Sequence, residues 1–244
     1  MRNILLTIQY DGTHYHGWQF QKNANSITNE LLKSIYAVTG ESVLLHGSGR
    51  TDTGVHALGQ KAHFLTGSRV PISRFPDALN VNLPRDIVVV DAIEMPLDFH
   101  SRYHAKTKTY EYLIHNGRYP SPLTLNKVWY VRKPLSVERM IEAVKYFEGE
   151  HDFTAFMSAG SYVERTVRVI HHASLEEQEG LLHFEISGNG FLYNMVRIMA
   201  GTLVFVGLGK LRPDDIPKVL ESKDRRQAGM TAPACGLYLK DVIY

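Results

Sequence analysis

The chain has 244 residues, with 44% hydrophobic and 21% charged side chains and a net charge of +2; this is ordinary for a globular protein and allows one large domain or two of about 100–150 residues. Its single cysteine, Cys235, excludes an internal disulfide and fits a reducing cytoplasm. The longest apolar stretch, residues 199–208, is too short to cross a bilayer and no signal-peptide pattern opens the chain, so we expect a cytoplasmic protein without a membrane segment.

Basic side chains are concentrated in the middle of the chain. Residues 97–139 contain eight of them against three acidic ones, whereas residues 1–96 are balanced and residues 140–244 are slightly acidic. A local basic surface attracts a polyanion such as RNA more strongly than the net charge indicates. The alternative is a solvated face with a chance cluster of charges, so composition alone does not establish RNA binding.

The N-terminal part of the chain alternates strands and helices. Residues 3–10 predict a strand that ends at an Asp-Gly turn, and Ser26 begins a helix with an apolar stripe that Gly40 ends. Strands over 43–48, 62–65 and 87–90 and a short amphipathic helix over 72–79 complete this part. The order strand, helix, strand, strand, helix, strand is the split βαβ, or ferredoxin-like, pattern.

Two stretches of this part carry aromatic or imidazole side chains with more than one interpretation. Residues 15–21 alternate rings with hydrogen-bonding groups, as single-stranded RNA recognition uses, but a short strand that buries Tyr15 or Trp18 is the favoured interpretation. His100 and His104 stand four residues apart. No cysteine or carboxylate joins them at ligand spacing, so we expect surface histidines and no metal site.

The second half has a similar order of elements. Residues 106–114 predict a strand with Lys108, Tyr110, Tyr112 and Ile114 on one face. A strand over 129–131, a helix capped by Ser136, a hairpin of strands 166–175 and 181–187, a long helix over 191–206, a helix after 212–215 and a strand over 236–243 follow. The helix after Ser136 is expected to turn Met140, Ile141, Val144 and Phe147 inward.

These elements predict an α+β protein with two domains, an N-terminal half over 1–105 and a C-terminal half over 106–244. Each half is expected to be ferredoxin-like, or RRM-like. We expect the halves to share one extended, mainly antiparallel sheet with a central active-site cleft. No segment is rich enough in Pro, Gly and Ser to indicate freely tethered domains.

Residues 47–57 place three glycines around an aspartate in the sequence Gly-Ser-Gly-Arg-Thr-Asp-Thr-Gly-Val-His-Ala. Glycine permits positive φ and the close approach of a ligand, so this loop can present Asp52 at the mouth of a cleft. Arg50 precedes the carboxylate by two residues and His56 follows it by four. The spacing also fits an Asx-type turn in which Asp52 only satisfies local N–H groups, and the loop alone leaves both interpretations open.

The motif Gly49-Arg50-Thr51-Asp52-x-Gly54-Val55-His56-Ala57 resembles the active-site signature of the tRNA pseudouridine synthase A family. Thr53 departs from the alanine of that signature, which concerns loop packing more than chemistry. Further stretches resemble the family in the expected order and extend the resemblance over residues 3–243: Lys-Thr-Lys-Thr-Tyr-x-Tyr at 106–112, Gly-x-His-Asp-Phe-Thr-x-Phe at 149–156, and residues 190–198 and 232–239.

The resemblance implies the pseudouridine synthase fold and the isomerisation of uridine to pseudouridine at positions 38 to 40 of the tRNA anticodon stem-loop. The uracil–ribose C–N bond breaks, the base turns, and C5 is joined to C1′. A base in a stem must first be flipped out, at a cost of about a few kcal/mol. No step requires a metal, redox chemistry or a small-molecule cofactor, and the chain contains no P-loop, GxGxxG or Cys/His ligand pattern.

By the same resemblance, Asp52, Tyr110 and Arg197 are the catalytic residues. Asp52, ionised near neutral pH, would attack C1′ or C6 of uridine or remove the C2′ proton, and the sequence does not choose among these paths. Arg197 would pair with Asp52 in a closed pocket, although a solvent-facing position on an amphipathic helix is the alternative. Tyr110 would stack on the uracil and assist removal of the C5 proton.

Substrate binding is assigned to Arg50, Tyr110, Leu237 and His56. Arg50 would occupy the space left by the flipped base and hold phosphate, its alternative being a structural ion pair, and Leu237 would lie against the base. The resemblance also implies a homodimer in which one tRNA contacts both subunits. Two other classes of function stay open from the residues: a non-catalytic RNA-binding protein with RRM-like sheets, and a hydrolase that uses Asp52, although no paired carboxylate or triad accompanies it.

Overall fold

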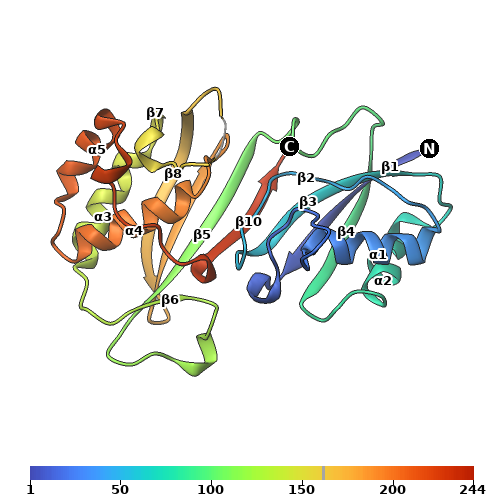
Figure 1. Ribbon diagram of the computed structural model, residues 1–244, viewed down its shortest axis with the longest axis horizontal. Helices are drawn as coiled ribbons and strands as arrows, with labels where there is room; N and C mark the ends of the chain where they lie inside the picture. The colour runs from blue at the N-terminus through green and yellow to red at the C-terminus, as the bar shows by residue number, and fades with distance from the viewer. Residues whose placement is uncertain (161–162) are drawn as a thin grey trace. The chain divides into compact units, whose positions relative to one another are not determined.

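A computed structural model describes residues 1–160 and 163–244 of the chain (Figure 1). The chain forms two compact units. The N-terminal unit comprises Met1–Lys106 together with Tyr238–Tyr244, and the C-terminal unit comprises Thr107–Leu237. None of the helices in the described residues is both long and apolar enough to cross a membrane.

The N-terminal unit contains a mainly antiparallel sheet and two helices. Its strands are β1 (Arg2–Tyr10), β2 (His46–Gly47), β3 (His56–Thr66), β4 (Ile87–Met95) and β10 (Leu237–Ile243), and its helices are α1 (Ile27–Thr39) and α2 (Phe75–Asn80). The strand order is β4-β1-β3, and β2 pairs with β3 on the side away from β1. This is the predicted split βαβ order.

The closing strand β10 adds to this sheet from the far end of the sequence. It runs parallel to β3, with Tyr238 opposite His56 and Leu239 opposite Ala57. Sequence order places residues 238–244 in the C-terminal half, but their backbone pairs with β3, and they therefore belong to the N-terminal unit. Strand pairing between distant segments leaves no local signal in the sequence.

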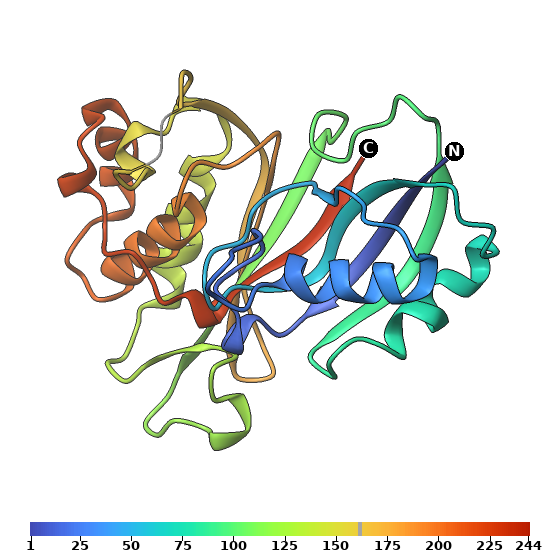
Figure 2. The same cartoon turned by 45° about the vertical axis from the view of Figure 1, so that its right-hand side comes forward.

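The helices of this unit begin and end where their capping residues predict. The Ser26 hydroxyl accepts the Asn29 N–H at the start of α1, and Gly40 adopts the left-handed conformation (φ 71°) at its end. Helix α1 buries Ile27, Leu31 and Ile35, and its Ser34 hydroxyl donates to the Leu79 carbonyl of α2. Figure 2 shows α1 and α2 on one face of the sheet.

The C-terminal unit contains further strands and helices. Its strands are β5 (Thr107–Asn116), β6 (Trp129–Val131), β7 (Gly149–Asp152), β8 (Val167–Gln178) and β9 (Leu181–Gly188). The order is antiparallel β5-β9-β8-β7, and the short β6 runs parallel to the end of β5. The helices are α3 (Val137–Val144), α4 (Met195–Gly207) and α5 (Ile216–Ser222).

The α+β class with mainly antiparallel sheets is confirmed, and several element boundaries differ from prediction. The strand expected over 43–48 is only two residues long, whereas β3 and β4 are longer than expected because their ends pair with β1. Helix α4 begins four residues late, since Asn194 before it has a positive φ of 59°. The prediction that Ile141 turns inward was wrong, as it is 37% exposed on α3.

Candidate active site

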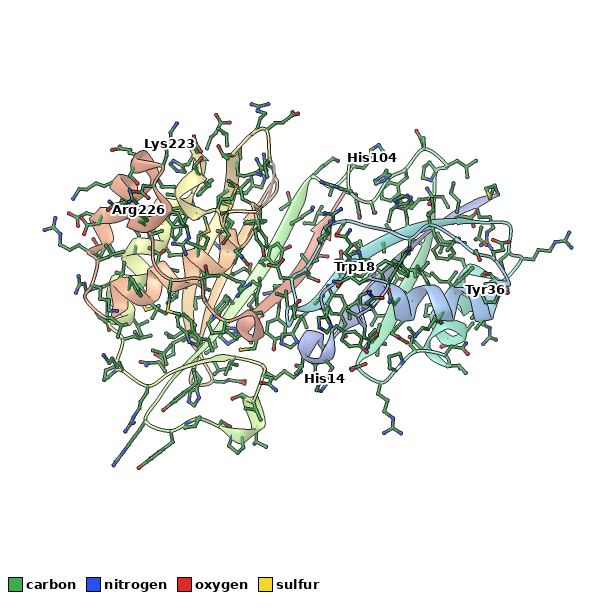
Figure 3. The ribbon with its side chains drawn as sticks, viewed as in Figure 1. His14, Trp18, Tyr36, His104, Lys223 and Arg226 are labelled. Atoms are coloured by element: carbon green, nitrogen blue, oxygen red, sulfur yellow. The ribbon has the colours of Figure 1, made fainter. Side chains whose placement is uncertain are left out.

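The Asp52 loop joins β2 to β3 in the N-terminal unit and is packed tightly against the segment after β1. The Trp18 N–H donates to the Thr51 carbonyl (3.0 Å), and the Gly54 N–H donates to the Tyr15 carbonyl (3.3 Å). Tyr15 and Trp18 are buried, as favoured over base stacking, with Trp18 only 4% exposed (Figure 3), whereas Phe20 is 52% exposed. The short strand expected to bury them does not form, because residues 15–21 lie in bends and irregular backbone between β1 and α1.

Glycines make this backbone approach sterically feasible. A Cβ added at Gly12 would overlap the Val55 carbonyl oxygen, and one added at Gly17 would lie 2.5 Å from the Thr51 carbonyl oxygen. Gly17 also has a positive φ of 83°, which side-chain-bearing residues rarely adopt. The loop is therefore held on both flanks by backbone contacts that only glycine permits.

Polar groups complete the support of the loop. The hydroxyls of Tyr10 and Thr51 are hydrogen-bonded at 2.8 Å in the interior, one position before Asp52. The Val55 N–H donates to the Asp52 carbonyl (3.1 Å), which closes the turn. Asp52 itself is half-buried and Arg50 is exposed. The arrangement fixes the backbone beneath the carboxylate while leaving part of the residue accessible.

His56 is the first residue of β3 and is 1% exposed. Its ring stacks on Tyr238, with centroids 4.7 Å apart. Its Nδ1 lies 3.1 Å from the Gly12 nitrogen and 3.0 Å from Asp11 Oδ1. A bare Nδ1 accepts the Gly12 N–H, and a protonated Nδ1 pairs with the Asp11 carboxylate. In either state His56 ties the end of the Asp52 loop to the turn after β1.

The second group of sequence-predicted residues lies in the C-terminal unit, beginning with Tyr110 on β5. Tyr110 is buried, and its ring contacts that of Phe191 edge-on, with centroids 5.1 Å apart. Two residues on, the fully buried Tyr112 donates its hydroxyl to the Pro233 carbonyl (2.7 Å). Burial raises the pKa of Tyr112, so this phenol stays protonated and keeps its hydrogen bond.

Arg197 lies in the first turn of α4 and is half-buried. Its Nε donates to the Ala232 carbonyl (2.8 Å) and one terminal nitrogen donates to Asn194 Oδ1 (2.7 Å). Asn194 is itself held by the Ser158 hydroxyl, to which its side-chain amide donates (3.0 Å). These two hydrogen bonds to neutral acceptors help to orient the guanidinium within its own unit.

The segment before β10 links the two elements that carry Tyr110 and Arg197. Residues 232–237 contact α4 through Ala232 and β5 through Pro233, and a Cβ at Gly236 would lie 2.7 Å from the Tyr112 ring. Leu237, the sequence-predicted base contact, ends this segment and is buried. Tyr110, Arg197 and Leu237 therefore belong to one connected framework.

The structure groups the predicted residues by unit. Arg50 and Asp52 lie in the loop before β3 and His56 begins that strand. Tyr110, Arg197 and Leu237 share the framework of β5, α4 and residues 232–237. Sequence reasoning did not single out Tyr10, Gly12 or Asn194, which orient these residues. The Asp-Gly pair after β1 was a signal of a turn, but not of the residue that the turn contacts.

A cluster of three imidazoles lies at the other end of β3. The His63 ring centroid is 5.1 Å from that of His46 and 4.7 Å from that of His100. Burial, reinforced by the neighbouring histidines, lowers the pKa of His63 to about 4. Its Nδ1 accepts the Ser101 N–H (3.1 Å), and His104 is exposed (Figure 3). The described residues hold no group of three side chains arranged to bind a metal.

Comparison with known proteins defines the class of this chain. The sequence model of the family described as tRNA pseudouridine synthase matches residues 6–104 and 143–244, which contain all six predicted site residues except Tyr110. The chain therefore belongs to the tRNA pseudouridine synthase family. The resemblance seen in the Asp52 motif is confirmed.

Individual relatives match the chain over its full length. Proteins named tRNA pseudouridine synthase A from Acetivibrio thermocellus and Caldicellulosiruptor bescii are each 52% identical to it, and one from a Thermoanaerobacter species is 50% identical. In each case the match spans 244 residues and 100% of both chains.

Proposed function

We propose that this protein is a tRNA pseudouridine synthase that isomerises uridine at positions 38–40 of the anticodon stem-loop, with Asp52 as the nucleophile. The family match and the full-length relatives named for this activity support the proposal. The observation that carries the site assignment is the Asp52 loop, whose backbone is clamped on both flanks by Gly12 and Gly17. A reacting carboxylate needs such a preorganised position.

The remaining site residues divide the work of binding and proton transfer. Tyr110 stacks on the uracil and assists loss of the C5 proton, and Arg197 supplies positive charge for the reacting carboxylate. Arg50, which is exposed beside the nucleophile, takes the space of the flipped base and contacts phosphate. Leu237 lies against the base. Pairing of Arg197 with Asp52 stays a prediction.

The structure supports an indirect role for His56 in place of the substrate contact that the sequence indicates. The sequence assigns it to substrate binding, but its ring is enclosed by Tyr238, Gly12 and Asp11. We propose that His56 acts on the substrate through the loop, by holding the residues that follow Asp52. His56 is therefore a positioning residue rather than a residue that touches the substrate.

The cellular setting is proposed from the family and the composition. We propose a cytoplasmic homodimer whose two subunits contact one tRNA and whose chemistry requires no metal or small-molecule cofactor. The rival function is RNA binding without chemistry. It is less well supported, because it leaves the glycine-clamped carboxylate without a use.

Nucleoside analysis tests the proposal. An unmodified tRNA transcript is incubated with the protein, digested, and its uridine and pseudouridine are quantified at each position. We expect pseudouridine at positions 38–40 with the mass of the RNA unchanged. Released uracil or a broken chain would indicate a hydrolase, and intact uridine in a tRNA that binds tightly would indicate a non-catalytic binder.

A further inference from the structure

The connection between β5 and β6 is a basic arm, which we define as residues 117–133. It contains Arg118, Lys127, Arg132 and Lys133 and no acidic residue, and no Asp or Glu occurs anywhere from residue 112 to residue 137. In Figures 1 and 2 its loop, drawn in light green, runs out beyond the strands of the C-terminal unit. The proposed chemistry at Asp52, Tyr110 and Arg197 makes no use of it.

The two ends of the basic arm are held side by side. Strand β6 pairs in parallel with β5, with Asn116 opposite Val131. The Asn116 side-chain amide donates to the carbonyls of Val131 (2.7 Å) and Lys133 (2.8 Å), and the Tyr130 hydroxyl donates to the Arg118 carbonyl (3.0 Å). These bonds bring Arg118, from one end, beside Arg132 and Lys133, from the other.

The three cations at this base are exposed and lack carboxylate partners. Within residues 1–160 and 163–244, no ion pair with Asp or Glu engages Arg118, Arg132 or Lys133. Two exposed cations elsewhere in the same unit do have carboxylate partners: Arg212 contacts Asp214 at 3.1 Å and Lys218 contacts Asp215 at 2.8 Å. Like charges held together by the backbone repel each other unless an anion joins them.

An aromatic ring accompanies this charge. Tyr119 is 68% exposed, and the Arg118 guanidinium lies over its ring at 5.1 Å. A guanidinium and a tyrosine presented together offer phosphate contact and a stacking face, which is the combination that RNA-binding surfaces use. A protein partner that docks through apolar contacts would not need three cations at the base of the arm.

We propose that the basic arm binds the phosphate backbone of the tRNA away from the reacting uridine, through Arg118, Arg132 and Lys133. This inference rests on the proposed function, because tRNA is the polyanion that the enzyme must hold. The arm contributes to tRNA affinity independently of sequence, since phosphate contacts carry no base information.

The test is the salt dependence of tRNA binding by the full chain. The variant Arg118→Gln/Arg132→Gln/Lys133→Gln is compared with wild type on an unmodified tRNA transcript. Each lost phosphate contact lowers the slope of log K against log salt by about 1, so we expect the slope to fall by about 2–3 and Kd to rise by roughly tenfold or more at physiological salt. At saturating tRNA, kcat is expected to be unchanged.

A matched control variant shows whether a change in slope comes from lost phosphate contacts of the arm or from the lower positive charge of the protein as a whole. Arg212→Gln/Lys218→Gln removes two cations of the same unit that are also exposed but already have carboxylate partners. We expect its slope to stay within about 0.5 of wild type. A triple-variant slope equal to that of the control overturns the proposal, and so does a change of oligomeric mass in light scattering without a change of slope, which would assign the arm to a second copy of the chain.

Failure of this inference is distinguishable from failure of the proposed function. If the wild type forms pseudouridine and the triple variant has the same salt slope as the wild type, the proposed function stands and the proposed role of the arm fails. If the salt slope falls in the triple variant but the wild type leaves uridine unchanged, the isomerase assignment fails and the arm stands as an RNA contact.

Discussion

The Asp52 loop and the basic arm are both connections between strands, and they are built on opposite principles. Backbone contacts at Gly12 and Gly17 and a buried hydroxyl pair hold the loop on every side. The arm is anchored at its base and at Val128, whose carbonyl accepts a hydrogen bond from the Cys235 thiol (3.5 Å), and its tip carries exposed apolar residues such as Leu123, which is 91% exposed. The loop is specified by shape and the arm by charge, as expected for chemistry that needs a fixed position and for phosphate binding that does not.

The largest effect is expected from a substitution that fills the space between the turn after β1 and the Asp52 loop. In Gly12→Ala the new Cβ overlaps the Val55 carbonyl oxygen, so the turn and the loop must separate. We expect unfolding free energy to fall by about 3 kcal/mol or more and the rate of isomerisation to fall about 100-fold. Denaturant unfolding and pseudouridine formation are measured together.

Gly40→Ala is the control for that substitution. Gly40, unlike Gly12, has a positive φ, and a Cβ there meets nothing within 4 Å. We expect it to cost about 1 kcal/mol from backbone strain alone and to leave the reaction rate unchanged. Equal effects of the two substitutions on the rate would show that the loop does not depend on close approach at Gly12.

Removing the His56 ring tests whether the loop is held from its far end as well. His56→Ala empties a buried site and leaves the Gly12 N–H without its acceptor. We expect a loss of roughly 2–3 kcal/mol in unfolding free energy, with kcat lowered and KM unchanged. His56→Asn, which keeps an acceptor near the Nδ1 position, should recover part of kcat; a raised KM with normal kcat would instead favour direct contact with the substrate.

The sequence named candidate residues for the chemistry but not the residues that support them in the structure. The glycine-rich motif singled out Asp52, and alternation along β5 placed Tyr110 and Tyr112 on one face of the strand, where both are buried. Gly12 looked only like a turn residue, because its neighbour Val55 is distant in sequence.

The predicted boundaries of some elements were wrong for a related reason. The extra length of β3 comes from pairing with β1, and the late start of α4 follows from the positive φ of Asn194. Tertiary contacts decide both, and periodicity alone does not contain them.

Acid is expected to act on the histidine cluster of the N-terminal unit and not on the basic arm. The folded pKa of His63, about 4, lies below its ordinary value of 6.5, so between these values the unfolded chain binds more protons and stability falls as pH falls. The lowered pKa of His100 acts in the same direction. We expect a loss on the order of 2 kcal/mol from pH 7 to pH 4, while the arginine and lysine charges of the basic arm do not change.

His63→Asn identifies the group responsible. Its side-chain oxygen can still accept the Ser101 N–H, but it does not titrate. The unfolding free energy of this variant should depend less on pH between 4 and 6.5 than that of wild type. An identical pH profile in both proteins would assign the acid sensitivity to other groups.

The smallest effect is expected at the tip of the basic arm. Leu123→Ala removes a side chain that is almost fully exposed, so the unfolding free energy should change by no more than about 0.5 kcal/mol. The rate of isomerisation should not change. A loss of more than about 1 kcal/mol would show that the tip is packed in solution, and the contrast with the Asp52 loop would fail.

The central claim is that Asp52 performs the isomerisation, and tritium release from tRNA labelled at uridine C5 tests it most directly. The C5 hydrogen must be lost when C5 becomes the glycosidic carbon. We expect release by wild type and none above background by Asp52→Asn, provided that the variant is folded and binds tRNA as wild type does. Equal release by the two proteins would remove Asp52 from the mechanism.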